Sequence, residues 1–299
     1  MKITVIILTY NEEIHIQRAI SSVVDFADNI YVVDSNSSDN TKNIALEMGA
    51  VYIAHPFVTQ AKQFNWALKQ LPSNTEWVFR LDADEIVSDE LANSIENKIP
   101  LLSSQIVGLE VSRRIIFMGR PIKWGGLFPV STLRLFRYGY GESEDRWMDE
   151  HIIVDGEVSH LDGELLDNNL KPLSWWISKH NNYASREAVE ILNEDFNFLP
   201  DKVVSSKVSG KAGFKRFLKL RVYNKLPIGL RSFLYFIYRF VFRLGFLDGK
   251  EGIIFHFLQG FWYRFLVDSK VYEMRKKYKK DSVGIADGIK VFLGVDIYK

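Results

Sequence analysis

The sequence contains no cysteine. This absence excludes disulfide bonds, thiolate metal sites and a cysteine nucleophile, so the chain is not a disulfide-stabilised secreted protein. Long apolar runs are also missing. Met1 to Leu8 is too short for a signal peptide, and the uncharged run from Gly252 to Tyr263 is shorter than the roughly 18–20 residues that span a bilayer. We therefore expect a cytoplasmic protein without a transmembrane helix.

The net charge is small overall, but charged residues are unevenly divided. The net charge of the 299 residues is +1, with 47% hydrophobic and 25% charged residues, as in a folded globular protein. Residues 1–201 carry 17 Lys and Arg against 30 Asp and Glu, whereas residues 202–299 carry 21 against 7. An acidic part that binds an anionic nucleotide needs a cation between them, and a basic, apolar part suits anionic lipid.

The first hundred residues alternate between strand and helix patterns. Apolar runs predict strands over 3–9, 29–33, 51–54 and 77–81, and helical spacing predicts helices over 11–24, 41–48 and 60–71. This alternation predicts an α/β fold with a mostly parallel sheet flanked by helices. From about 106 to 160 the pattern changes to strands and loops, and residues 174–194 read as a helix.

Three polar clusters follow strands of the predicted sheet. They are Thr9-Tyr10-Asn11, Asp34 and Asp82-Ala83-Asp84. Ligands of open α/β sheets bind at the carboxyl ends of the strands. We therefore expect the three clusters to converge on one edge.

Asp82-Ala83-Asp84 has the oxygen donors that Mg²⁺ and Mn²⁺ prefer. Two carboxylates at i and i+2 after a strand can reach one ion, directly or through water. A divalent cation stabilises the charge that grows on a departing nucleoside diphosphate. The alternative is a solvated turn, and the position after the fourth strand favours the metal site.

Other polar residues leave two interpretations open. Asp34 can accept hydrogen bonds from a base or ribose, or can cap the following helix, although Asp39 is nearer to it. Asp149-Glu150 offers a carboxylate that could take the proton of an acceptor hydroxyl, or an exposed acidic turn. Trp124-Gly125-Gly126 fits either an acceptor cleft or a plain turn.

Several of these segments together resemble glycosyltransferase family 2, which has the GT-A fold. The resemblance covers roughly residues 1–195. It is carried by Thr9-Tyr10-Asn11-Glu12, Val32-Val33-Asp34-Ser35, Asp82-Ala83-Asp84-Glu85 and the run from Arg113 to Arg137. That last run is similar to a branch of bacterial lipopolysaccharide-core and exopolysaccharide β-glycosyltransferases, and Phe257 to Arg264 resembles a segment of exopolysaccharide transferases.

The resemblance implies a role for each matching residue. Donor-binding roles fall on Thr9, Tyr10, Asn11, Glu12, Asp34, Gln60, Lys62, Asn65, Asp82 and Ala83. Asp84 would ligate Mg²⁺ or Mn²⁺, with Asp82 facing ribose or a metal-bound water, and His151 would reach the metal or the pyrophosphate. Glu150 is the preferred catalytic base, with Asp149 kept open because the usual order of the pair is reversed here.

The C-terminal region, residues 201–299, mixes basic and aromatic residues. Residues 202–250 hold 12 Lys and Arg and a single acid, and Pro227 is expected to break the helix there. Such a segment is typical of a helix on a membrane surface and is too apolar for nucleic-acid binding. A helical subdomain packed on the catalytic part is the alternative.

The sequence thus predicts a GT-A catalytic domain over 1–200, with a nucleotide-sugar half (1–100) and an acceptor half (101–200). A membrane-associating helical region would follow over 201–299. The expected activity is inverting, metal-dependent hexosyl transfer from a nucleotide sugar, preferably a UDP-sugar. The expected acceptor is a lipid-linked saccharide at the inner face of the cell membrane. Alternatives are transfer to polyprenyl phosphate and a non-catalytic adaptor. A dinucleotide-dependent oxidoreductase would need a glycine-rich turn after the first strand, and this sequence has no glycine there.

Overall fold

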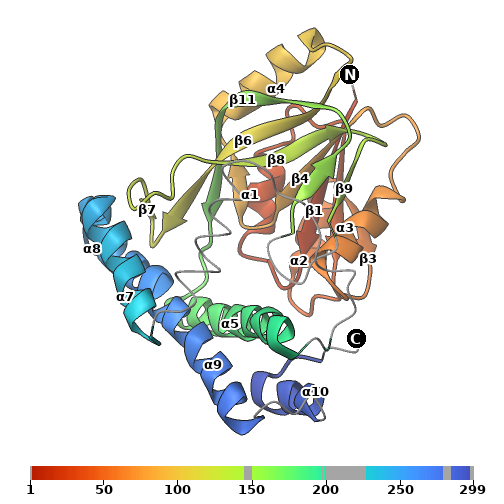
Figure 1. Ribbon diagram of the computed structural model, residues 1–299. Helices are drawn as coiled ribbons and strands as arrows, with labels where there is room; N and C mark the ends of the chain where they lie inside the picture. The colour runs from red at the N-terminus through yellow and green to blue at the C-terminus, as the bar shows by residue number, and fades with distance from the viewer. Residues whose placement is uncertain (1, 145–149, 197, 199–226, 279–283, 297–299) are drawn as a thin grey trace. The chain divides into compact units, whose positions relative to one another are not determined.

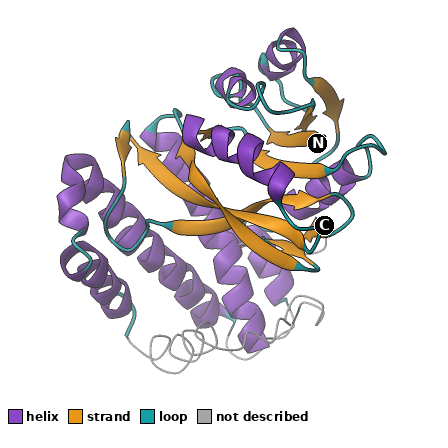
Figure 2. Ribbon diagram, turned by 90° about the horizontal axis from the view of Figure 1, so that it is seen from above, coloured by secondary structure: helices purple, strands orange, loops and turns teal. Residues whose placement is uncertain are grey.

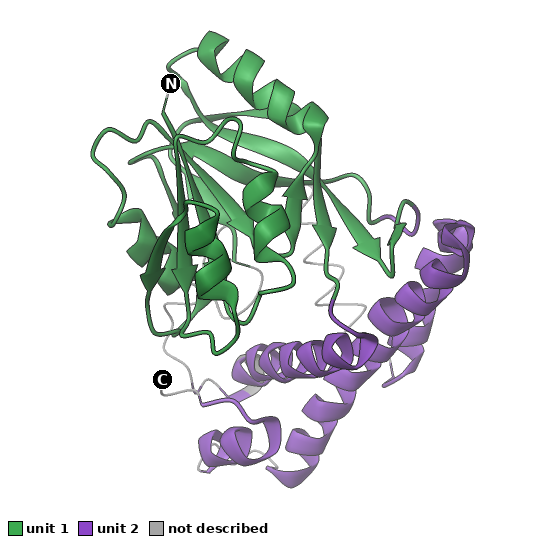
Figure 3. Ribbon diagram, turned by 180° about the vertical axis from the view of Figure 1, so that it is seen from behind, with its two compact units in different colours: residues 1–123, 127–170 green, residues 124–126, 171–299 purple. Residues whose placement is uncertain are grey.

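The computed structural model describes residues 2–144, 150–196, 198, 227–278 and 284–296. Two compact units are present (Figure 3). The first comprises residues 1–123 and 127–170, and the second comprises residues 124–126 and 171–299.

The first unit is built on one twisted sheet (Figures 1 and 2). Among the described residues this sheet has nine strands in the order β3-β2-β1-β4-β8-β6-β11-β5, with β7 paired to β6. Its strands are β1 (Ile3–Thr9), β2 (Asn29–Asp34), β3 (Val51–Ala54), β4 (Trp77–Asp82), β5 (Glu85–Val87), β6 (Ile106–Phe117), β7 (Arg120–Pro121), β8 (Val130–Arg137) and β11 (Glu157–Asn168). A small antiparallel pair, β9 (Gly141–Ser143) and β10 (Ile152–Val154), lies outside it.

The sheet changes character along its width. Strands β3, β2, β1 and β4 run parallel, whereas β8 is antiparallel to both β4 and β6. The change coincides with the loss of crossover helices after residue 106, because antiparallel neighbours need only short connections. The prediction of an α/β sheet flanked by helices, with a helical C-terminal region, is confirmed.

Helices cover both faces of the parallel strands. Successive side chains of β1 point to opposite faces: Ile3, Val5 and Ile7 join one core cluster, and Ile6 joins another. The first cluster also contains side chains of α1 (Ile16–Ser21), α2 (Thr41–Glu47) and α4 (Asp89–Lys98). The second contains side chains of α3 (Gln60–Leu68). Because β1 is buried on both faces, it reads as a continuous apolar run.

The first helix starts later than the sequence pattern predicts. Asn11 has a left-handed backbone (φ 53°), and α1 begins only at Ile16. The acidic residues after Asn11 therefore lie in a turn instead of a first helical turn, and the predicted helix over 11–24 is wrong at both ends.

The second unit is helical. Helix α5 (Leu173–Phe196) packs against α9 (Tyr263–Lys277), where Ala184, Tyr263 and Val267 form a small core. Glu187 of α5 accepts hydrogen bonds from Tyr263 (2.7 Å) and Arg264 (2.6 Å) of α9. This packing explains why the second unit begins at residue 171, whereas the composition suggests a boundary near 200.

The remaining helices of the second unit are short. They are α7 (Leu230–Ile237), η4 (Tyr238–Phe242), η5 (Gly245–Asp248), α8 (Gly249–Phe255), η6 (His256–Trp262), α10 (Ile285–Gly288) and η7 (Ile289–Leu293). Within the described ranges, no helix is long and apolar enough to cross a membrane. The basic segment 202–226 lies outside the described residues.

Candidate functional site

The carboxyl ends of β1, β2 and β4 meet at one edge of the sheet, as the sequence predicts. Thr9 is in register with Asp34 on β2, and Leu8 is in register with Asp82 on β4. The Thr9 hydroxyl donates a hydrogen bond to Asp34 at 2.9 Å. The candidate donor-binding residues of the three clusters therefore share one edge.

Asp34 is the centre of a hydrogen-bonded turn. Its fully buried carboxylate accepts hydrogen bonds from the Thr9 hydroxyl, from the Ser37 amide (2.7 Å) and hydroxyl (2.5 Å), and from the Tyr52 hydroxyl (2.9 Å). Burial raises the pKa of Tyr52 to about 12, and the bond to Asp34 adds to this effect. Four donors fill the usual acceptor capacity of a carboxylate. A base or ribose could bind Asp34 only by replacing one of them.

Asp39, and not Asp34, supports the start of α2. Its carboxylate accepts hydrogen bonds from the Thr41 amide (3.0 Å) and hydroxyl (2.5 Å).

The segment after β1 has mostly structural contacts. The Asn11 side chain accepts a hydrogen bond from the Ser38 amide at 2.9 Å, and Tyr10 is exposed. Glu12 pairs with the buried His15 at 2.5 Å. The other ring nitrogen of His15 accepts a hydrogen bond from the Leu170 amide at 2.8 Å, so Nδ1 carries the proton that Glu12 accepts.

The first turns of α3 connect two of the polar clusters. The Gln60 amide donates to Asp82 at 3.3 Å, and Gln63 accepts a hydrogen bond from Ser35 after β2 at 3.0 Å. The Lys62 side chain is exposed. Asn65 exchanges two 2.8 Å hydrogen bonds with the backbone of Ser143, so it holds β9 in place.

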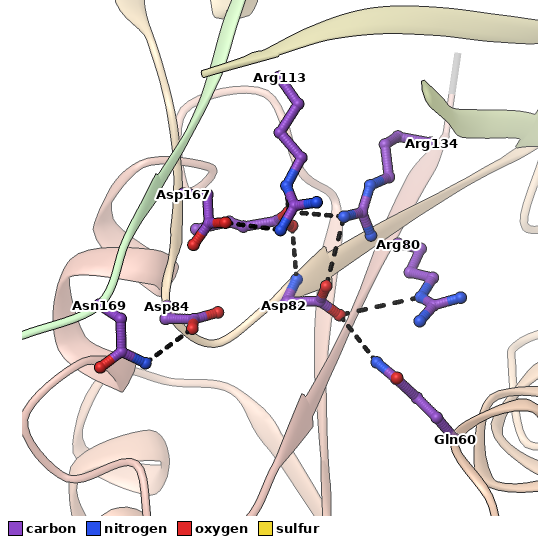
Figure 4. A network of polar contacts seen from close by, with 9 residues as sticks. Gln60, Arg80, Asp82, Asp84, Arg113, Arg134, Asp167 and Asn169 are labelled. Carbon is purple, nitrogen blue, oxygen red and sulfur yellow. Dashed lines mark hydrogen bonds and ion pairs between the residues drawn. The ribbon is translucent and has the colours of Figure 1, made fainter. Parts of the chain in front are cut away.

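Asp82 is surrounded by arginines (Figure 4). Its carboxylate lies 3.3 Å from Arg134 of β8 and 3.8 Å from Arg80 of β4. The adjacent buried Glu85 binds Arg134 at 2.5 Å and lies 3.2 Å from Arg113 of β6. The Glu85 carboxylate also accepts a hydrogen bond from the Asp82 amide at 3.0 Å.

The arginines fix the ionisation of Asp82. Burial alone would raise the pKa of Asp82, but Arg134, Arg80 and Arg113 together outweigh burial and hold this pKa well below its usual range. Burial raises the pKa of Glu85, against the opposing effect of Arg134. Asp82 is therefore an anion whose charge is already balanced by the protein.

Asp84 has a different environment. Its carboxylate accepts a hydrogen bond from the neutral amide of Asn169 at 2.8 Å (Figure 4), and its carbonyl accepts one from the Asn168 amide at 3.0 Å. Both asparagines lie at the end of β11, which runs beside β6 and β5. Asp82 is thus in contact with two arginines, whereas Asp84 is hydrogen-bonded to a neutral amide and interacts with Arg18 and Arg113 through their charges.

The residues around Asp84 fit a cation that is bound jointly by protein and substrate phosphates better than a cation bound by protein side chains alone. In the part of the chain that the structure describes, no three carboxylate or imidazole side chains lie close enough together to hold a metal ion. Mg²⁺ typically binds one or two carboxylates and completes its shell with water and substrate phosphates. Asp84 can supply such a carboxylate. Ala83 between the aspartates is buried, and His151 is exposed.

Of the two candidate bases, only Glu150 lies among the described residues. Asp149 lies outside the described residues. Glu150 is partly buried and its charge acts on Arg80. Burial lowers the pKa of Arg80, while the carboxylates of Asp82, Glu150 and Glu85 act in the opposite direction. Glu150 therefore belongs to the same electrostatic neighbourhood as Asp82.

Sequence reasoning missed the cationic half of this site. Arg80 lies in the otherwise apolar strand β4, and a buried arginine in such a strand is a signal that it has a partner. Arg113 and Arg134 lie in the run from Arg113 to Arg137 that carries the family resemblance, but the resemblance assigned them no role. Asn169 carried no local signal, because it meets Asp84 only through the pairing of β11.

Comparison with known proteins gives a family match for part of the first unit. Residues 4–113 match the model of glycosyl transferase family 2. The chain is 41% identical over 95 residues to an uncharacterized glycosyltransferase of Rickettsia typhi, and 40% identical over 95 residues to one of Rickettsia bellii. Each match covers 32% of this chain and 32% of the relative, so the chain spans about a third of the length of these relatives.

Solved structures give a partial superposition. Glucosyl-3-phosphoglycerate synthase from Mycobacterium tuberculosis, in complex with Mn²⁺, UDP and glucosyl-3-phosphoglycerate, is 23% identical with a TM-score of 0.33. The match covers 38% of this chain and 44% of that one. By the family match and the Rickettsia relatives, the N-terminal part of the chain is similar to glycosyltransferase family 2 over residues 4–113.

Proposed function

We propose that the protein is an inverting, metal-dependent hexosyltransferase that uses a nucleotide sugar, preferably a UDP-sugar. The proposal depends on Asp84. This residue lies beside the C-terminal ends of the parallel strands, and its carboxylate accepts a hydrogen bond from a neutral amide. The family match of residues 4–113 agrees with it.

Asp84 would hold the cation, with Asn169 fixing the orientation of its carboxylate. When bound, Mg²⁺ or Mn²⁺ would supply charge neutralisation for the departing diphosphate. Asp82, held as an anion by Arg80 and Arg134, would face ribose or a metal-bound water. Thr9, Asn11 and Asp34 would border the nucleoside from the neighbouring strand ends.

The transfer itself needs a base. The acceptor hydroxyl oxygen bonds to the anomeric carbon as the bond from that carbon to the diphosphate oxygen breaks. The hydroxyl proton passes to a carboxylate, Glu150 in preference and Asp149 as the alternative. The influence of Glu150 on Arg80 supports its presence near Asp82.

The acceptor of the proposal is a lipid-linked saccharide at the inner face of the cell membrane, in the synthesis of a bacterial surface polysaccharide or lipopolysaccharide. The excess of Lys and Arg in residues 202–299 supports contact with anionic lipid. Polyprenyl phosphate is the alternative acceptor.

Turnover of radiolabelled UDP-sugars with Mn²⁺ tests the activity, using wild type and Asp84→Asn. We expect wild type to release UDP and the variant to lose at least 100-fold in turnover while it remains folded. Equal turnover by the variant would refute the role of Asp84. Product analysis then separates a lengthened glycan from a single sugar on polyprenyl phosphate, and no donor turnover under any condition would favour the non-catalytic adaptor.

A further inference from the structure

The helical hairpin in residues 228–262 has an inverted distribution of side chains. One arm is α7 with η4, the other is α8 with η6, and the turn between them contains η5. Soluble amphipathic helices turn their apolar stripe inward and their polar face outward. Here the interior positions are small or polar: Ser232, Arg239, Gly245, Asp248, Gly252, His256 and Gly260, with Phe255 beside them.

The outward positions of both arms are aromatic or aliphatic. On the first arm and the turn they are Leu230, Phe233, Leu234, Tyr238, Val241, Phe242, Leu244, Phe246 and Leu247, and on the second arm they are Ile253, Ile254 and Phe257. Their spacing of three and four residues places them along one stripe of each helix. Phe242 is 73% exposed. Contiguous exposed apolar surface of this kind marks an interaction site.

The polar groups inside the hairpin bind one another. Arg239 donates to Gln259 at 2.6 Å and to Nδ1 of His256 at 3.3 Å. Because an arginine has no acceptor, His256 Nδ1 is unprotonated, and Nε2–H donates to Asp248 at 3.0 Å. Asp248 also accepts a hydrogen bond from the Trp124 amide at 3.1 Å. Ionisable side chains within lipid follow this rule of facing inward and pairing.

Gly245 lets the turn pack closely against both arms. A Cβ added at Gly245 would lie 2.9 Å from the Arg239 carbonyl oxygen and 2.9 Å from the His256 ring. Small residues at helix contacts are also typical of packing within membranes, where apolar side chains are turned toward the lipid.

Charge and length indicate how such a hairpin would meet a bilayer. In residues 228–262, all of which are described, the exposed charged side chains are Arg243 and Lys250, both basic, and the acidic Glu251 is half-buried. The first arm, Leu230 to Phe242, is roughly 20 Å long at 1.5 Å per residue. That length is below the roughly 30 Å hydrocarbon thickness, which agrees with the lack of a helix that could cross a membrane among the described residues.

We propose that the hairpin 228–262 inserts its outward apolar face into the hydrocarbon of one leaflet of a phospholipid bilayer. Arg243 and Lys250 lie at the headgroup phosphates. If a second copy of the chain covered this face, Arg243 and Lys250 of both copies would repel one another at the contact. Anionic headgroups would instead neutralise these side chains. This insertion does not depend on the proposed glycosyl transfer.

Depth-dependent fluorescence tests the insertion on the full chain. Since the sequence has no cysteine, Phe242→Cys can carry a single NBD label, with Leu101→Cys in the first unit as the matched control, because Leu101 is 84% exposed. Vesicles of phosphatidylcholine and phosphatidylglycerol (7:3) contain lipids brominated in the acyl chains. We expect a blue shift and quenching at position 242 and neither change at position 101.

Flotation with the same vesicles in 0.5 M NaCl supplies a second measurement. The double variant Phe242→Asp with Ile253→Asp should lose at least tenfold in vesicle partitioning, and Leu101→Asp should match wild type. Thermal stabilisation by UDP with Mn²⁺ should be the same in all three proteins, which separates insertion from donor binding.

Three outcomes would overturn the proposal. Water-like emission from position 242 on vesicles that carry the protein would indicate surface attraction alone. Failure of wild type to float would exclude insertion. A dimer in sedimentation equilibrium that Phe242→Asp converts to a monomer, without flotation, would show that a second copy covers the apolar face.

Discussion

Asp82 and Asp84 are two residues apart, yet their carboxylates have different partners. Arg80 and Arg134 approach Asp82 within the sheet, whereas Asp84 is bonded to the Asn169 amide. A carboxylate already paired with two guanidinium groups has less capacity to bind a cation. The sequence alone places both aspartates after the same strand, and only their partners distinguish Asp84, the proposed metal ligand, from Asp82, a residue of an ion-pair network.

Substitution should separate these two roles. Asp82→Asn leaves Arg80 and Arg134 without their shared anion, so we expect a loss of unfolding free energy on the order of 3 kcal/mol. Asp84→Asn should change it by less than about 1 kcal/mol. Denaturant unfolding of both variants and wild type measures the difference. Equal losses would contradict the assignment of distinct environments.

Acid should act on the same network. Because the arginines lower the pKa of folded Asp82, its contribution to stability is present above the ordinary aspartate pKa of about 4 and is lost as the pH falls below it. The difference in unfolding free energy between wild type and Asp82→Asn should therefore shrink below pH 4. A difference independent of pH would argue against an ionised Asp82.

Asn169 should orient Asp84 without touching the substrate. Asn169→Ala removes the 2.8 Å hydrogen bond and should weaken Mn²⁺-dependent UDP binding about 10- to 100-fold, the range for partners of metal ligands. Titration calorimetry at several Mn²⁺ concentrations measures this. If added Mn²⁺ does not restore any binding, Asn169 acts on something other than the metal ligand.

The base can be assigned from a kcat and KM comparison. Glu150→Gln should lower kcat by about 10²–10⁴ and leave the donor KM nearly unchanged, since general-base catalysis acts on the acceptor hydroxyl. Asp149→Asn is the matched variant, and the larger kcat loss identifies the base. Full activity of both variants would exclude this pair.

At the scale of elements, local pattern predicted the parallel strands and the long helix well. The apolar runs of β1, β2 and β4 and the helical spacing of α5 lie close to their predicted bounds. The start of α1 was wrong, because Asn11 adopts a left-handed backbone that spacing does not reveal. The contribution of β11 to the site depends on its pairing with β6 and β5, which sequence patterns do not specify.

Helix α5 should make the second unit sensitive to mild acid. His180 stacks on Trp176 with ring centroids 3.5 Å apart and donates to the Trp176 carbonyl at 2.9 Å. Burial lowers the pKa of His180 to about 4, from an ordinary value near 6.5. The unfolded chain therefore binds the proton first, and stability should fall as the pH drops from about 6.5 to about 4.

His180→Phe removes this titration while keeping an aromatic ring. We expect the melting temperature of the variant to decline less than that of wild type between pH 7 and pH 4.5, as followed by circular dichroism. Parallel declines would show that other groups cause the acid sensitivity.

At the scale of the molecule, composition and packing divide the chain differently. The charge balance changes near residue 201, but the helical unit begins at residue 171 because α5 packs on α9. Trp124, which the sequence associates with an acceptor cleft, belongs to this helical unit through the bond of its amide to Asp248. The charge of a segment depends on the solvent or partner that it contacts, whereas the boundaries of the compact units depend on which helices pack together.

Titration calorimetry of UDP with wild type and Asp84→Asn, with and without Mn²⁺, tests whether Asp84 holds the cation that binds the donor's diphosphate. We expect wild type to bind UDP only with Mn²⁺, and the folded Asp84→Asn variant to bind UDP at least 100-fold more weakly. Mn²⁺-dependent binding of equal strength in both proteins would contradict this role of Asp84.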